Sequence, residues 1–268
     1  MKQHIILIFF VALLAACSGN EARKQEAAAL VAQARALADN HNYDSALTVL
    51  DTLNVKYRDC LEERREGTMV RLNAMGALTR DSIASAELQL RAVTARIDSL
   101  APAFKKVDIQ GTEGFFVDKS VYTGNEMNSN GIQARIDEQG YCFIVANVEG
   151  RRIGLNQIIF DQTSTPPIES VSIEGSEIMS VTQEPATALL NALSEAKANA
   201  KIILSGLKGK IDITLNAKQL GSIRATWEYA QALQQQRALN IRLEKLERQL
   251  AKLNDQIASQ IKVDEPQN

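Results

Sequence analysis

The sequence carries no strong net charge of either sign. Its 268 residues include 30 Lys and Arg against 32 Asp and Glu, which gives a formal net charge of −2. This balance excludes proteins that hold nucleic acid through bulk positive charge. Apolar residues make up 45% of the chain and charged residues 23%. Such a composition is typical of globular proteins and excludes disorder as the dominant state.

Residue patterns of the common metal and phosphate sites are scarce as well. The chain has only two histidines and no Cys-x-x-Cys pair, so we expect no metal site. The glycines of Gly111–Gly114 and Gly206–Gly209 favour β-turns, because neither pair lies between a strand and a helix as a phosphate-binding loop requires. We therefore expect no cofactor.

The apolar run at the N-terminus is too short to cross a membrane. Ile5–Leu14 has ten residues, about half of the roughly 20 that a transmembrane helix needs. It follows a short basic start, which is typical of a signal peptide.

The run leads into Leu14-Ala15-Ala16-Cys17, which resembles the lipobox of bacterial lipoproteins. The resemblance implies a signal peptide of residues 1–16 and acyl chains, palmitate among them, on Cys17. Several acyl chains anchor a protein to a membrane stably. Because Ser18 rather than Asp follows the cysteine, the resemblance also implies the outer membrane. The alternative is an ordinary signal peptide followed by a chance cysteine.

With Cys17 assigned to lipid, two cysteines and one histidine remain after the leader. A compartment beyond the inner membrane permits disulfides, so Cys60 and Cys142 are a possible pair. The alternative is that both are small buried side chains, which the apolar neighbours of Cys142 favour. His41 lies between two asparagines and predicts a turn residue.

Two long segments without proline predict long helices at residues 59–101 and 217–263, the second with Asn216 as its N-cap. Residues 17–58 predict a helical hairpin that breaks near His41. Each long helix carries apolar residues at alternating spacings of three and four, the pattern of a coiled-coil seam. The seam residues are Ile83, Ala86, Leu90, Val93, Ile97 and Leu100 in the first helix, and Leu239, Leu243, Leu246, Leu250, Leu253 and Ile257 in the second.

An apolar seam needs a partner. Antiparallel pairing of the two helices within one chain is the simplest solution, because the segment between them leaves one helix and returns to the other. Pairing with a second copy is the alternative, so the sequence leaves a monomer and a coiled-coil dimer both open.

Between the helices, residues 104–216 change to short β-branched stretches separated by turns. We expect a mostly antiparallel head with one helix at Pro185–Ala200 and hairpin-like turns at Glu138–Gly140 and Glu149–Arg151. The predicted fold class is α+β, with long antiparallel, coiled-coil-like helices flanking an inserted β-rich domain. The expected strands are Phe115–Tyr122, Ile132–Ile136, Tyr141–Val148, Arg152–Phe160, Val171–Ile173, Ile178–Val181, Ile202–Leu204 and Ile211–Leu215.

The polar segment Thr123–Gly131 is the first candidate for a recognition loop, because it is the longest turn-rich stretch of the head. Its alternative is a flexible connection between strands. The side chains that would make contacts are Asn125, Glu126, Asn128 and Asn130.

Charged residues of the head suggest two further sites. Asp137 with Glu138, and Glu174 with Glu177, are candidate carboxylate pairs for acid–base work, although solvated turn acids are commoner. A basic cluster could meet an anionic glycan or lipid headgroup, or could simply protect strand edges from aggregation. Its members are Arg151, Arg152, Lys201, Lys208 and Lys210.

Together these features favour a non-catalytic binding or scaffold protein of the cell envelope, because titratable residues do not converge in the sequence as those of an active site usually do. The expected partners are the membrane, through the N-terminal lipid, and a protein or a glycan. No nucleic-acid partner is expected. The competing hypothesis is an envelope hydrolase that acts on glycan through carboxylates.

Overall fold

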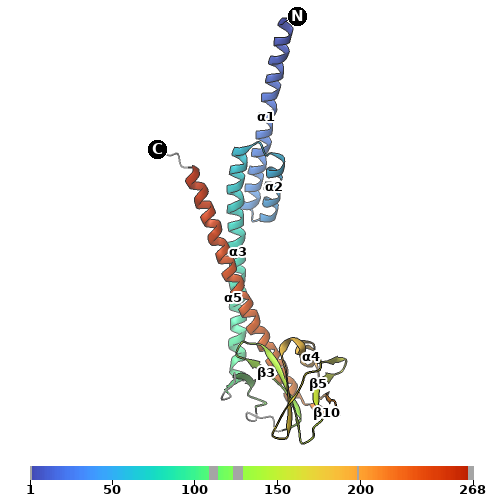
Figure 1. Ribbon diagram of the computed structural model, residues 1–268. Coiled ribbons are helices and arrows are strands. Elements are labelled where there is room, and N and C mark those ends of the chain that lie inside the picture. The colour runs from blue at the N-terminus through green and yellow to red at the C-terminus, as the bar shows by residue number, and fades with distance from the viewer. Residues whose placement is uncertain (1, 109–113, 123–128, 198, 265–268) are drawn as a thin grey trace. The chain divides into compact units, whose positions relative to one another are not determined.

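The computed structural model describes residues 2–108, 114–122, 129–197 and 199–264, with side chains between Asn20 and Ile261 (Figure 1). The chain divides into two compact units, Met1–Leu88 with Ile241–Asn268, and Gln89–Asn240. The fold class is α+β, as predicted, with five α-helices in the described part and two antiparallel sheets. Two of the helices are long, α3 (Leu61–Leu100) and α5 (Ala217–Asp264).

The first unit begins with the expected helical hairpin. Helix α1 (Lys2–Asp39) is followed after a short connection by α2 (Tyr43–Lys56). His41 occupies that connection with a φ of 58°, so the prediction of a turn residue is confirmed. The N–H of Asn42 donates to the carbonyl of Leu37 at 2.9 Å and closes the end of α1.

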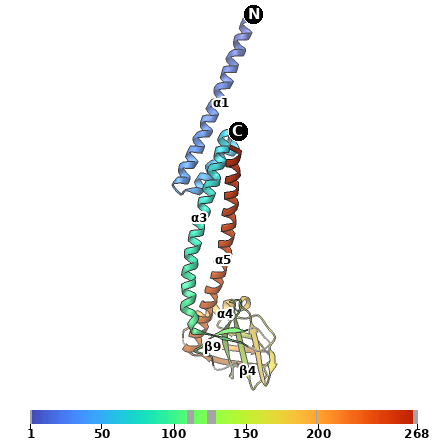
Figure 2. The same ribbon diagram turned by 90° about the vertical axis from the view of Figure 1, so that its left-hand side faces the viewer.

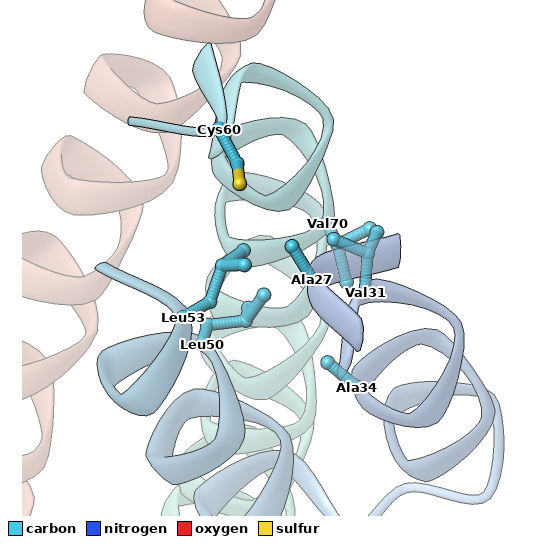
Figure 3. Close-up of a cluster of buried hydrophobic side chains, with 7 residues drawn as sticks. All are labelled: Ala27, Val31, Ala34, Leu50, Leu53, Cys60 and Val70. Carbon is cyan, nitrogen blue, oxygen red and sulfur yellow. The ribbon is translucent and has the colours of Figure 1, made fainter. Parts of the chain in front are cut away.

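The hairpin packs against the first half of α3 through a small apolar core, which Figure 3 shows in close-up. Small side chains of α1 face leucines of α2, and this contrast in size lets the helices approach closely. The buried residues of this core are Ala27, Val31, Ala34, Leu50, Leu53, Cys60 and Val70. Hydrophobic burial, rather than the exposed ion pairs around it, holds the hairpin in place.

The second unit holds two sheets in which every described pairing is antiparallel. The larger sheet has the order β1-β2-β3-β4-β8-β7, and the smaller has the order β10-β9-β5-β6. The strands are β1 (Phe104–Val107), β2 (Phe115–Asp118), β3 (Gly131–Asp137), β4 (Cys142–Glu149), β5 (Leu155–Phe160), β6 (Thr163–Ser164), β7 (Val171–Ile173), β8 (Ser176–Val181), β9 (Ala200–Gly206) and β10 (Gly209–Leu215).

Helix α4 (Gln183–Glu195) and the first half of α5 pack against these sheets (Figure 2). The indole N–H of Trp227 in α5 donates to Asn191 Oδ1 in α4 at 2.8 Å, and Trp227 is buried. Tyr229 of α5 stacks on Phe104 with ring centroids 4.6 Å apart. The largest buried side chains of α4 are Leu189, Leu190 and Leu193.

Several predicted boundaries were wrong. The stretch Phe115–Tyr122 yields only the short strand β2, and Phe104–Val107, which was not predicted, forms β1. Helix α4 ends at Glu195 because the chain turns into β9 at Ala200. Residues 149–151 do not form a hairpin turn, since β4 pairs with β3 and β8 whereas β5 pairs with β6 and β9 in the other sheet.

The N-cap of α5 is confirmed as Asn216. Asn216 Oδ1 accepts the N–H of Gln219 at 3.0 Å, and Gln219 Oε1 accepts the N–H of Asn216 at 2.9 Å, a reciprocal capping box. Val93, Ile97, Leu239 and Leu253 of the predicted seams are buried. Within the described residues, none of the helices combines the length and the apolar content that a membrane crossing requires.

Candidate functional site

A polar pocket of about 240 Å³ lies in the second unit, between one edge of β3 and the first two turns of α5. Its walls come from three places: the segment after β2, the first half of β3, and the N-terminal part of α5. The lining residues are Ser120, Val121, Ser129, Ile132, Gln133, Ala134, Asn216, Lys218, Gln219, Ser222 and Ile223.

The short length of β2 opens this pocket. In the described residues β2 pairs with β3 only at Ile136 and Asp137, whereas β4 pairs with β3 along Gly131–Ile136 on its other side. The capping box at Asn216 fixes the start of α5 beside the exposed edge. The pocket is therefore built from two rigid elements, which is the usual requirement for a binding site of defined shape.

One wall of the pocket is oriented by a buried cation. The Nε of Arg135 donates to Gln133 Oε1 at 2.7 Å, so the amide oxygen of Gln133 is held against the strand. The guanidinium carbon of Arg135 lies 4.2 Å from the ring centroid of Phe115, a cation–π contact. Burial lowers the pKa of Arg135 to about 10, which leaves the guanidinium charged at neutral pH.

The chemistry of the pocket is that of hydrogen bonding. Three serine hydroxyls and the amides of Asn216, Gln133 and Gln219 surround it, and Lys218 supplies a positive charge. No Asp, Glu, His or Cys is among the described lining residues. Such a set can bind a polar or anionic group.

The predicted recognition loop adjoins this pocket. Val121 and Ser129, which stand close to its two ends, both line the pocket. Asn125, Glu126 and Asn128 lie outside the described residues. Asn130 is described, and its Oδ1 accepts the N–H of Glu149 at 2.7 Å. Asn130 therefore holds the end of β4 in place.

Sequence reasoning missed the α5 side of the pocket. Lys218, Gln219 and Ser222 read as ordinary residues of a helix start, and only the fold places them opposite β3. The available signal was the presence of Lys218, Gln219 and Ser222 directly after the N-cap.

The first predicted carboxylate pair is split between two structural contacts. Asp137 Oδ1 accepts the N–H of Tyr141 at 2.8 Å and closes the β3–β4 turn. Glu138 forms an ion pair with Lys106 at 2.8 Å, and hydrogen bonds to Glu138 and Asp108 raise the pKa of Lys106. Neither carboxylate faces the other as a catalytic pair would.

The second predicted pair is separated by burial. Glu174 is exposed in the β7–β8 turn with a φ of 46°, whereas Glu177 on β8 is only 5% exposed. The Glu177 carboxylate accepts the N–H groups of Ile153, Gly154 and Leu155 at 3.0, 3.0 and 3.1 Å. Burial opposes ionisation, but these three hydrogen bonds outweigh it, so the pKa of Glu177 lies below its usual value. Its role is to hold the connection between the two sheets.

The remaining candidate residues are also engaged structurally. Cys60 and Cys142 are free thiols, each buried in its own unit, and burial raises the pKa of Cys142 to about 12. His41 Nδ1 lies 2.7 Å from the hydroxyl of Tyr43, and that hydroxyl donates to Asp81 Oδ2 at 3.2 Å. Among the described residues, no three His, Cys, Asp or Glu side chains are placed to hold a metal ion.

The predicted basic cluster assembles in part. The N–H of Lys208 donates to the carbonyl of Ile153 at 2.7 Å, which brings the β9–β10 turn against the segment that carries Arg151 and Arg152. Lys210 directly follows this turn on β10. Lys201 pairs with Thr214 at the opposite end of β9 and does not belong to the cluster.

No protein-family model, curated protein or solved structure matches the chain.

Proposed function

We propose that this chain is a lipid-anchored protein of the cell envelope, located at the outer membrane, whose β-rich head binds a glycan without cleaving it. The lipobox-like Leu14-Ala15-Ala16-Cys17 supports the anchor, with Cys17 as the lipidated residue. One observation supports binding above all: the pocket beside β3 combines hydroxyls, amides and a lysine without a carboxylate.

The glycan assignment follows from the chemistry and size of the pocket. Hydroxyl and amide groups both donate and accept hydrogen bonds, so they complement the hydroxyls of a sugar. Lys218 adds a preference for an acidic sugar. At about 240 Å³ the pocket is smaller than the roughly 300–1,000 Å³ sites that enclose drug-sized molecules. It therefore takes one unit of a longer chain.

The contacts of the four proposed carboxylates support recognition rather than hydrolysis. The carboxylates of Asp137, Glu138 and Glu177 are each held by a backbone N–H or a lysine, and Glu174 stands apart in an exposed turn. A glycosidase needs two carboxyl groups flanking one bond. We therefore place the function of the head in recognition.

Binding is tested by titrating the chain with oligomers of uronic acid and of N-acetylglucosamine, using calorimetry. Replacing Lys218 by Met is expected to weaken binding of the acidic oligomer about tenfold, because a hydrogen bond to a charged group contributes about 1.5–3 kcal/mol. Lys245→Met removes an exposed lysine from the distal half of α5 and should leave binding unchanged.

The same mixtures distinguish binding from hydrolysis. New reducing ends should not accumulate above the level of the oligomer alone. Release of reducing ends by the wild-type chain, or equal affinity in Lys218→Met, would overturn the assignment of the pocket.

We further propose that the predicted seams of α3 and α5 pair antiparallel within one chain, in a coiled-coil-like arrangement. Contacts within each unit support this. In the first unit Gln249 Nε2 lies 3.4 Å from Thr79 Oγ1, and in the second Gln236 Nε2 donates to Thr94 Oγ1 at 3.0 Å. Residue numbers rise on one helix as they fall on the other. Light scattering should therefore give a monomer mass, and a stable dimer would favour pairing between chains.

A further inference from the structure

Three turns of the second unit are hydrogen-bonded to one another. The N–H of Leu207, in the β9–β10 turn, donates to Gly154 O at 3.1 Å, which lies in the β4–β5 connection. The N–H of Gly150, in the same connection, donates to Gly175 O in the β7–β8 turn at 3.4 Å. The buried carboxylate of Glu177 holds this connection through three more hydrogen bonds. The turns therefore form one rigid surface.

This surface carries a group of exposed cations. We call Arg151, Arg152, Leu207, Lys208 and Lys210 the basic tip. Its four charged side chains are exposed, and none forms an ion pair within the described part of the chain.

Fewer exposed acidic side chains than basic side chains lie at or beside the basic tip. Glu149 at the end of β4 and Glu174 in the β7–β8 turn are exposed, and Asp212 is exposed two residues after Lys210 on β10. Four cations therefore stand against three exposed anions. Glu177 is buried, and its carboxylate is stabilised by three backbone N–H groups and by the charge of Arg152. The net positive charge would attract an anionic surface.

Leu207 sets the basic tip apart from an ordinary charged surface. It occupies the two-residue connection between β9 and β10 and is 84% exposed, although polar residues are the usual choice in such a turn. A Cβ placed on Gly154 would stand 3.4 Å from Leu207 Cβ, so Leu207 lies beside the β4–β5 connection. Ile173, 52% exposed in the adjacent β7, adds a second apolar side chain. Burial within the fold does not account for either residue.

We propose that the basic tip docks onto an anionic phospholipid bilayer, with Leu207 inserted among the lipids and the four cations at the headgroups. An anionic glycan would form ion pairs with the cations but would not bury an exposed leucine. A bilayer uses both, because apolar side chains gain from leaving water and basic side chains gain from the negative surface potential. This inference stands independently of the lipid on Cys17 and of the glycan pocket.

The experiment uses the full chain carrying Cys17→Ser, so that acylation cannot contribute. Sedimentation compares binding to vesicles of equal parts phosphatidylglycerol and phosphatidylcholine with binding to phosphatidylcholine alone. Any binding through the apolar leader adds to the binding measured with both kinds of vesicle. The wild-type tip should bind the anionic vesicles more tightly, and added salt should weaken this binding.

Variants of the basic tip give the quantitative test. Lys208→Gln with Lys210→Gln should lower the partition coefficient about 30-fold, at about fivefold per cation near an anionic surface. Leu207→Ser should lower it about tenfold by removing the inserted side chain. The matched control, Lys197→Gln with Lys201→Gln, removes the same charge at the opposite end of β9 and should bind as the parent does. All of these side chains are exposed, so the variants should keep the parent melting temperature.

Two results would overturn the proposal. Equal losses in the tip and control variants would indicate general electrostatic attraction rather than docking by the tip. Unchanged binding in Leu207→Ser, together with binding to dextran sulfate as tight as to the vesicles, would indicate a polyanion site instead of a bilayer surface.

Discussion

Glu177→Ala is expected to destabilise the protein by about 3–5 kcal/mol, because it leaves three backbone N–H groups without an acceptor. Those of Ile153 and Leu155 are in buried hydrogen bonds, and that of Gly154 is partly buried. The loss corresponds to a fall in melting temperature of about 10 °C, measured by calorimetry. Glu169→Ala, which truncates an exposed carboxylate, is the control and should change stability by less than about 0.5 kcal/mol.

The pH dependence gives a second readout for Glu177. Its pKa is lowered in the folded chain, so the ionised carboxylate stabilises the fold at pH values above the unfolded-chain pKa, about 4.3. That contribution is lost as the pH falls through the lower folded value. The stability gap between the wild type and Glu177→Gln should therefore be full at neutral pH and shrink in acid. A gap that stays constant from neutral pH to pH 3, or widens in acid, would contradict this assignment.

Leu53→Ala is expected to destabilise the protein by about 3–4 kcal/mol, the usual cost of a cavity at a fully buried leucine. Leu53 is fully buried in the core of the hairpin. Chemical denaturation measures the loss.

Gly67 provides a partner substitution for this cavity. A Cβ on Gly67 would stand 2.6 Å from Leu53 Cδ2 and 3.3 Å from Leu50 Cδ2. Gly67→Ala alone should cost about 1 kcal/mol, since overpacking exceeds the gain in helix propensity. In the double variant the new methyl occupies part of the space that Leu53 vacates. The double variant should therefore lose less free energy of unfolding than the two single variants lose together. We expect a difference of at least about 1 kcal/mol.

Gly76→Ala is the matched control on α3, because a Cβ there meets only the end of the Arg80 side chain at 3.7 Å or more. It should stabilise the chain by up to about 1 kcal/mol through helix propensity. Strict additivity of Gly67→Ala and Leu53→Ala would show that α3 does not pack on α2 at Gly67.

The long helices and the hairpin could be predicted from the sequence because their signals are local. Apolar spacing and the absence of proline mark α3 and α5, and Asn216 marks a cap that the structure confirms. Strand pairing is not local. The stretch around Glu149 reads as a hairpin turn, yet the chain crosses there to the other sheet. The distant Glu177 holds that crossing through three hydrogen bonds, and no pattern near residue 150 indicates it.

The candidate site could be predicted only in outline. The turn-rich segment after Tyr122 correctly indicated the end of β3 at which the pocket lies, since Val121 and Ser129 line the pocket. Lys218 and Ser222 lie about 90 residues further along the chain. They contribute to the pocket only because α5 packs beside β3, which the sequence pattern does not indicate. Adjacent acids in the sequence proved a poor guide, because strand alternation turns Glu177 inward while the turn exposes Glu174.

The anchor at Cys17 sets the compartment in which the head and its basic tip would act. Intact-mass analysis of the mature chain from a Gram-negative host, together with cell fractionation, tests it most directly. We expect the wild-type chain in the membrane fraction, beginning at Cys17 and heavier than its sequence by the mass of a diacylglyceryl group and an acyl chain. Ser18→Ala should keep that mass, and Cys17→Ser should leave an unprocessed or soluble chain. A processed Cys17→Ser chain retained on the membrane, or a wild-type mature chain without acyl mass, would contradict the account.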